Sequence, residues 1–138
     1  MADPKGFLKY KRRKLELQPP QQRLRHFQEF VEFTNPEHSE EQAARCMDCG
    51  IPFCQSGCPL GNLIPDFNDA VYRQDWKLAF QFLSQTNNFP EFTGRICPAP
   101  CESSCVLGLH SDAVTIEQIE KSIIETAFAQ GWVKPQIP

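Results

Sequence analysis

The sequence of 138 residues predicts a small all-α domain, and three observations favour that class. Residues 39–42 and 115–118 have the pattern of capping boxes, which mark the starts of helices. Apolar residues after Asp75 and after Thr115 recur at helical spacing. No segment alternates apolar and polar residues convincingly as a half-buried strand does. At this length the chain forms one domain, or one domain with a tail.

The first two expected helices flank the first cysteines of the chain. One opens with Ser39 as its N-cap, continues into Cys46 and ends near Gly50, so it delivers cysteines from a helix end. Pro65 fits the first turn of the next helix, because the missing N–H of proline costs nothing there. We expect this second helix to reach about Arg73.

Two more helices are expected farther along the chain. Asp75 can cap a third helix, whose residues at helical spacing are Trp76, Ala79, Phe80 and Leu83. Residues 87–100 resemble a loop that leads into the second group of cysteines. The final helix opens at the capping box of Thr115 and extends to about Gln130.

Seven cysteines lie in two tight groups, with none elsewhere. The groups read Cys46-x2-Cys49-x4-Cys54-x3-Cys58-Pro59 and Cys97-Pro98-x2-Cys101-x3-Cys105. Four thiolates complete one 4Fe-4S cluster, so seven thiols are one ligand short of two clusters. In the bacterial ferredoxin run the last cysteine, which precedes a proline, serves the other of two clusters. Cys58 occupies that position here.

Disulfides and zinc are the alternatives to iron and sulfide. Disulfides need an oxidising compartment, but residues 1–14 lack the apolar run of a signal peptide, and the cysteine count is odd. Cys46-x2-Cys49 alone would suit a zinc ribbon, but no second C-x2-C follows. His26, His38 and His110 lie at no ligand spacing. Iron–sulfur binding is therefore favoured, and a zinc-stabilised subunit-docking module without redox activity is the alternative.

Charge divides the chain unevenly. Residues 1–26 hold eight bases against two acids, whereas residues 27–138 hold six bases against fifteen acids. The basic run at residues 9–14 suggests nucleic acid, but so acidic a body argues against a nucleic-acid partner. The run is expected to dock on an acidic protein surface, its own or a partner's, or to remain a solvated tail. No stretch has the about 20 apolar residues of a membrane span, and reduced thiols indicate the cytoplasm.

Glu120 is the candidate eighth ligand. The apolar face of the final helix is formed by Ile116, Ile119, Ile123 and Ala127, and Glu120 lies in its middle. The neighbouring acids Glu117 and Glu125 fall on the opposite side, which we expect to be solvated. A carboxylate among isoleucines is costly unless it is neutralised, paired or bound to metal. Pairing with Arg95, or capping of a nearby loop, is the alternative to a role as ligand.

Longer stretches around the cysteines carry a family resemblance. They are residues 6–10 (GFLKY), 46–54 (CMDCGIPFC) with Cys58-Pro59, Asn62 and Ile64-Pro65, 94–102 (GRICPAPCE), and 114–116 (VTI) with Ile119-Glu120. In these motifs the chain resembles the N-terminal iron–sulfur domain of the glutamate synthase small (beta) subunit family, over essentially all 138 residues. The same domain type, an alpha-helical ferredoxin-like domain, occurs in dihydropyrimidine dehydrogenase.

The resemblance implies a ligand scheme for two 4Fe-4S clusters. By position, the first would be held by Cys46, Cys49, Cys54 and Cys105. The second would be held by Cys58, Cys97, Cys101 and Glu120, where dihydropyrimidine dehydrogenase has a glutamine in place of the glutamate. Cys105 and Cys58 would thus each cross to the other group and tie the two halves of the domain together. No residue of this chain is expected to be catalytic.

The resemblance also implies an organisation and a function. We expect a basic arm at residues 1–35, the two-cluster domain at 36–131, and at 132–138 a linker to a flavin and nicotinamide domain. The seven glycines form no G-x-G-x-x-G, so FAD and NADPH are expected to bind elsewhere in a parent oxidoreductase. The chain would be a fragment ending at a domain boundary, or less readily a free-standing adaptor. It would relay electrons from the FAD/NADPH domain to the large (alpha) subunit for glutamate biosynthesis.

Overall fold

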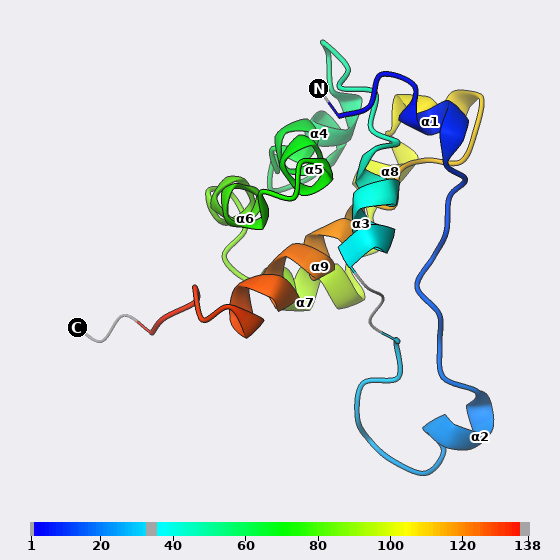
Figure 1. The fold of residues 1–138 in the computed structure, drawn as a ribbon, viewed down its shortest axis with the longest axis vertical. Coiled ribbons are helices and arrows are strands. Elements are labelled where there is room, and N and C mark those ends of the chain that lie inside the picture. Colours follow the sequence, from blue (N-terminus) through cyan, green and yellow to red (C-terminus); the bar gives the residue numbers. More distant parts are fainter. Residues whose placement is uncertain (1, 33–35, 136–138) are drawn as a thin grey trace.

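The computed structural model describes residues 2–32 and 36–135 and is built from helices (Figure 1). In chain order they are α1 (Gly6–Lys9), α2 (Pro20–Arg23), α3 (Pro36–Ala43), α4 (Phe53–Gly57), α5 (Ile64–Tyr72), α6 (Trp76–Ser84), α7 (Pro90–Ile96), α8 (Pro100–Ser103), the 3₁₀ helix η1 (Val106–Leu109) and α9 (Ile116–Ala129). Across the described ranges the β pairing is limited to one antiparallel bridge between Leu17 and Val31. The predicted all-α class is confirmed. Residues 33–35 of the expected arm and 136–138 of the expected linker lie outside the described residues.

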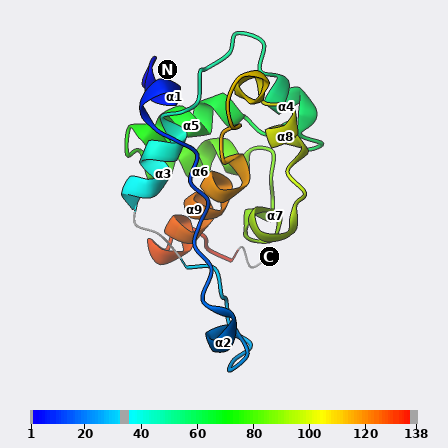
Figure 2. The same ribbon diagram turned by 90° about the vertical axis from the view of Figure 1, so that its right-hand side faces the viewer.

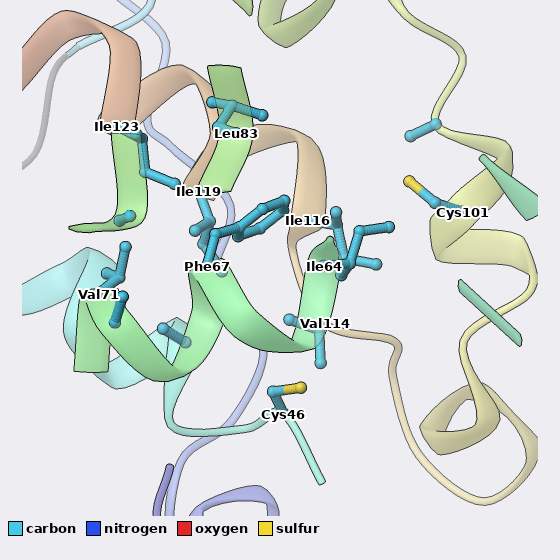
Figure 3. Close-up of a cluster of buried hydrophobic side chains, with 14 of the residues drawn as sticks. Cys46, Ile64, Phe67, Val71, Leu83, Cys101, Val114, Ile116, Ile119 and Ile123 are labelled. Atoms are coloured by element: carbon cyan, nitrogen blue, oxygen red, sulfur yellow. The ribbon is translucent and has the colours of Figure 1, made fainter. Parts of the chain in front are cut away.

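Helix α9 is the centre of the fold. It packs against α7, α6, α3 and α5, so the last helix of the chain contacts helices from its earlier and middle parts. The largest apolar side chains buried around it are Ile64, Phe67 and Val71 of α5, Leu83 of α6, and Ile116, Ile119 and Ile123 of α9 itself (Figure 3). Burying such side chains contributes about 1.5–3 kcal/mol each, which makes this cluster the main apolar source of stability.

Three of the expected helices are confirmed close to their predicted bounds. Pro65 lies in the first turn of α5, and the Asp75 carboxylate caps α6 by accepting a hydrogen bond of 3.0 Å from the Leu78 N–H. Helix α9 also begins after Thr115 as expected, but the Thr115 side chain makes no capping hydrogen bond. The Glu102 carboxylate takes its place and accepts a bond of 3.1 Å from the Glu117 N–H.

The predicted bounds of the helix before the first cysteines are wrong. Helix α3 begins at Pro36, so Ser39 lies inside it, and its buried hydroxyl donates to the Ser122 hydroxyl of α9 (2.9 Å). The helix ends at Ala43, before Cys46 and well before Gly50. Proline fits a first helical turn, which explains the earlier start. Cys46 is therefore delivered from an irregular segment after the helix.

The prediction of a loop over residues 87–100 is also wrong. Helix α7 occupies Pro90–Ile96 and α8 begins at Pro100, so a proline starts each of these short helices. Helix α7 packs closely on α9. The two backbones are so near at Gly94 that a Cβ atom there would lie 2.9 Å from the Lys121 Cα atom. Glycine permits this close approach of α7 to α9, and Cys97 follows as the C-cap of α7.

The basic run near the N-terminus contacts the domain itself. Arg12 bonds with the Glu102 carboxylate (2.5 Å) and donates to the Ala113 carbonyl (2.8 Å). Arg13 forms an ion pair with Glu41, whereas Lys11 is exposed. Arg12 and Arg13 therefore dock on acidic side chains of the chain itself, which is one of the two arrangements expected for this run.

The next part of the N-terminal segment leaves the helical body. Residues 16–32 project as a hairpin with α2 at its tip, away from the other helices in both views (Figures 1 and 2). Its base is held by backbone bonds from Gln18 N–H to the Phe30 carbonyl (2.9 Å) and from Glu32 N–H to the Glu16 carbonyl (2.8 Å). Its apolar side chains include Leu24, which is 88% exposed.

Candidate metal centres

The seven cysteines sit in the short segments between helices and at helix ends. Cys46 and Cys49 follow α3, Cys54 lies in α4, and Cys58 is the C-cap of α4. Of the second group, Cys97 caps the C-terminus of α7, Cys101 lies in α8, and Cys105 precedes η1. All seven are free thiols, so none is joined in a disulfide. Contacts of α4 with α8 bring the two groups of the sequence together.

One apolar pocket gathers four of the thiols. Cys46, Cys49, Cys54 and Cys105 line it, together with side chains that include Met47, Phe53, Ile64, Val114 and Ile116. Figure 3 shows Cys46 next to Val114 at one edge of the buried cluster, and Cys101 at another edge. Cys105 comes from the second group of the sequence but lies with three members of the first, as the family resemblance implies.

The environment of this pocket strongly disfavours free thiolates. Burial raises the pKa of Cys46 to about 12, and the charges of Cys54, Cys105 and Cys49 contribute to the same rise. Burial, followed by the charges of Cys105 and Cys49, raises the pKa of Cys54 to about 11. Such thiols lose their protons at neutral pH when a bound cation offsets the charge, and binding then releases protons. The pocket is therefore suited to a cationic, sulfur-seeking occupant.

The remaining thiols, Cys58, Cys97 and Cys101, lie at the end of α4, at the end of α7 and in α8, and Glu120 lies in α9. Burial, together with the charges of Cys58, Glu102, Glu120 and Cys97, raises the pKa of Cys101 to about 12. Cys58, Cys97 and Glu120 therefore all act on Cys101, although they come from α4, the end of α7 and α9. Ala99, between Cys97 and Cys101, has a left-handed backbone conformation (φ 52°). Its N–H donates a hydrogen bond of 3.4 Å to the Cys97 sulfur.

Glu120 is buried as predicted, but its partners were not foreseen. The Asn62 amide donates to Oε2 (3.1 Å), the Asn87 amide donates to Oε1 (2.9 Å), and the Thr93 hydroxyl also donates to Oε1. Burial raises the pKa of Glu120, while hydrogen bonds from Thr93, Asn62 and Asn87 oppose that rise. A carboxylate has about four lone-pair positions, so three donors leave room for one further partner.

The alternative hypothesis that Glu120 pairs with Arg95 is wrong. The Arg95 guanidinium bonds instead with Glu29 (2.7 Å) and with Glu125, on the outer side of α7 and α9. The expectation that Glu117 and Glu125 are solvated also needs correction, because both are half-buried. The sequence did not predict the hydrogen-bond donors to Glu120, because Asn87 and Thr93 lie in the segment that was expected to be a loop.

The donor chemistry of both groups fits iron–sulfur clusters. Cysteine thiolates are the usual ligands of such clusters, and the apolar walls of the pocket limit solvent access. Within the described ranges, no three His, Cys, Asp or Glu side chains converge at the spacing of a single metal ion. None of the helices in those ranges is long and apolar enough to cross a membrane.

Comparison with known proteins agrees with this chemistry. Residues 23–132 match the family described as dihydropyrimidine dehydrogenase domain II, 4Fe-4S cluster. The chain is 59% identical to a glutamate synthase [NADPH] small chain of Mycobacterium tuberculosis, over 100% of this chain and 28% of that protein. It is 50% identical to the Bacillus subtilis protein of the same name, over 100% of this chain and 30% of the relative.

A relative from yeast shows the same domain in a much longer protein. The chain is 49% identical to glutamate synthase [NADH] of Saccharomyces cerevisiae, over 97% of this chain and 6% of that protein. The chain thus spans less than a third of the bacterial small chains and a much smaller part of the yeast protein.

Proposed function

Because the chain belongs to the dihydropyrimidine dehydrogenase domain II family of 4Fe-4S domains, we propose that it is an electron-transfer module with two such clusters. Cys46, Cys49, Cys54 and Cys105 would hold one, and Cys58, Cys97, Cys101 and Glu120 the other. Bound clusters of this type take up and release single electrons at potentials set by their ligands and surroundings. The pocket that Cys105 shares with Cys46, Cys49 and Cys54 is the observation that carries this proposal.

The residues of the chain have distinct tasks in this function. The thiolates bind and orient the clusters, while Ile64, Val114 and Ile116 exclude water from the first group. Asn62, Asn87 and Thr93 hold the Glu120 carboxylate in one orientation through three hydrogen bonds. Ligand orientation of this kind commonly sets metal affinity and potential. The chain itself supplies no catalytic residue in this proposal.

The relatives suggest the larger assembly. We propose that the domain belongs to the small (beta) subunit of an NADPH-dependent glutamate synthase, with FAD and NADPH bound by other domains of that subunit. Electrons would pass through this chain to the large (alpha) subunit, for glutamate biosynthesis in the cytoplasm. The names of the bacterial small chains support this proposal, and so does the name of the yeast relative, glutamate synthase [NADH].

The projecting hairpin at residues 16–32 is our candidate for the contact with the large subunit. Leu24 and Phe27 are almost fully exposed at its tip, and Arg23 and Arg25 flank Leu24. A two-stranded hairpin is at best marginally stable alone, so a partner surface would stabilise it. An apolar groove with an acidic rim would complement this tip.

The contact is tested with the small and large subunits together. Replacing Leu24 and Phe27 by serine should weaken their association at least tenfold and leave the melting temperature of the free small subunit unchanged. Leu109→Ser is the control, because Leu109 is also exposed but lies on η1. Unchanged association of the double variant would place the contact elsewhere.

The cluster assignment is tested by counting metal. Anaerobic reconstitution should load about eight iron and eight sulfide per chain, as two cubane clusters require. The loaded protein should be brown with broad visible absorbance, whereas a zinc protein is colourless. About four iron per chain, or zinc retained in competition with iron and sulfide, would contradict the proposal.

A further inference from the structure

Arg45 is a fully buried cation directly beside the first group of thiols. It precedes Cys46 in the chain and is 1% exposed. Its guanidinium donates to three backbone carbonyls, those of Tyr10 (3.1 Å), Ala113 (2.9 Å) and Asp112 (2.6 Å). Among the described residues, no carboxylate oxygen lies within ion-pair distance of it, in contrast to Arg12, which pairs with Glu102. Carbonyl dipoles thus satisfy its hydrogen bonds and leave its full charge without an adjacent anion.

A buried charge of this kind is expensive, and the surroundings define what would offset it. Burial lowers the pKa of Arg45, and the neighbouring Arg12 cation adds to the effect, while Asp112 and Cys105 act in the opposite direction. Arginine nevertheless keeps its proton in proteins. Asp112 is exposed, so solvent screens its contribution. Cys105, which is half-buried, is therefore the group that would gain most from the Arg45 charge once it is a thiolate.

The second group has a different electrostatic environment. The charges that act on Cys101 are those of Cys58, Glu102, Glu120 and Cys97, and all of them are acidic groups. Of these acids, Glu102 is already paired with the Arg12 guanidinium. One group of ligands thus lies beside an unpaired buried cation, whereas the other lies among acids.

We propose that Arg45 is the fixed counter-charge of the first group and raises the reduction potential of its cluster above that of the second. Reduction adds one negative charge to an already anionic centre, and a nearby buried cation favours that change because little water screens it. The three carbonyl acceptors hold the guanidinium in place in both redox states. This inference depends on the proposed function, because it requires both clusters.

The test is a redox titration of the reconstituted full chain, followed by electron paramagnetic resonance. Arg45→Gln should lower the midpoint potential of the first cluster and leave that of the second unchanged. Arg45→Lys keeps the charge and should retain most of the native potential. Cys105→Ala and Glu120→Ala, which each remove a ligand from one group, assign the two signals. An unchanged first potential in Arg45→Gln, or equal shifts in the glutamine and lysine variants, would overturn the proposal.

A second variant keeps the test decisive if Arg45→Gln does not fold. The Arg45→Lys variant keeps a cation at this position and is compared with the native chain at low and high salt. Salt screens buried charges much less than exposed ones, so the first potential should stay above the second in both proteins when the ionic strength is raised from about 0.1 to about 1 M. A first potential equal to or below the second, or a difference that disappears at high salt with both clusters loaded, would reject the role of Arg45. Fewer than two clusters in the native chain would instead reject the proposed function.

Discussion

Glu120 combines a structural need with a chemical one. Its carboxylate lies between apolar helix residues, and its three donors are all neutral groups, so no described cation offsets its charge. Neutral donors reduce the cost of burying a carboxylate, but a metal ligand position would reduce it further. The three cysteines Cys58, Cys97 and Cys101 need a fourth partner for a cluster. One residue can therefore meet both needs.

We expect Glu120→Ala to lose one cluster selectively. The iron content should fall from about eight to about four per chain, because the first group keeps its four thiolates. Glu120→Gln should lose less iron, since its amide oxygen can still coordinate. Glu117→Ala, one turn earlier on the same helix, is the control. If Glu120→Ala retains eight iron and an unaltered paramagnetic spectrum, the carboxylate has a structural role and the eighth ligand lies elsewhere.

At the scale of elements, the contact between α7 and α9 depends on Gly94. Alanine favours a helix over glycine by about 1 kcal/mol, but overpacking costs about 1–3 kcal/mol when backbone atoms must move. Since the new Cβ would lie 2.9 Å from the Lys121 Cα atom, we expect Gly94→Ala to destabilise the domain by about 1–2 kcal/mol. Denaturant unfolding measures this change.

The matched control for Gly94 is Gly108→Ala. A Cβ at Gly108 would meet its nearest neighbour, the Ala113 Cβ atom, at 3.9 Å, which is an ordinary contact. The control should therefore keep the native unfolding midpoint. Equal midpoints for Gly94→Ala and the native chain would mean that α7 does not hold this close position in solution.

Arg12 holds the N-terminal segment against the domain through its contacts with Glu102 of α8 and with the Ala113 carbonyl before α9. Both members of the Arg12–Glu102 pair are largely buried, with side-chain exposures of 17% and 15%. Arg12→Glu would place two carboxylates together, and we expect a loss of about 2 kcal/mol, between the values for surface and buried pairs. Thermal unfolding measures the loss, with the exposed Lys11→Glu as the control. Equal effects of the two reversals would indicate a general charge effect.

Local signals explain which elements could be predicted from the sequence. Helices α5, α6 and α9 each have a strong start signal and apolar residues at helical spacing, so little depends on distant contacts. Helix α7 was missed because asparagine and proline dominate its start, and because its stability comes from packing on α9. Ser39 misled the prediction of α3, since its hydroxyl bonds with Ser122, far away in the sequence.

The same distinction applies to the candidate site. The burial of Glu120 followed from the period of its own helix. Its donors Asn62, Asn87 and Thr93 come from three other segments, and no local pattern connects them. Likewise, sequence spacing could not place Cys105 beside Cys46, because only the folded chain brings these segments together. Family resemblance supplied that part of the prediction.

At the scale of the whole molecule, one cysteine of each sequence group is associated with the other group. Cys58 acts on Cys101, and Cys105 lies in the pocket of Cys46, so each proposed cluster would join the early and late parts of the chain. Such clusters would bind the folded chain and not the unfolded one, so their binding free energy would add to the stability of the fold. The modest apolar core makes this contribution important.

We therefore expect the clusters and the fold to be lost together. Cys105→Ala should remove about four iron per chain from the first group, and Cys58→Ala about four from the second. Each variant should lower the melting temperature by at least about 10 °C, because the loss of even about 3 kcal/mol of binding free energy corresponds to a shift of that size in a chain of this length. Circular dichroism and visible absorbance, recorded during one thermal scan, should show coincident transitions for helix loss and cluster loss. Iron release well below the helical transition, with no change in the helical midpoint, would show that the helices fold without the clusters and that the interlock contributes no stability.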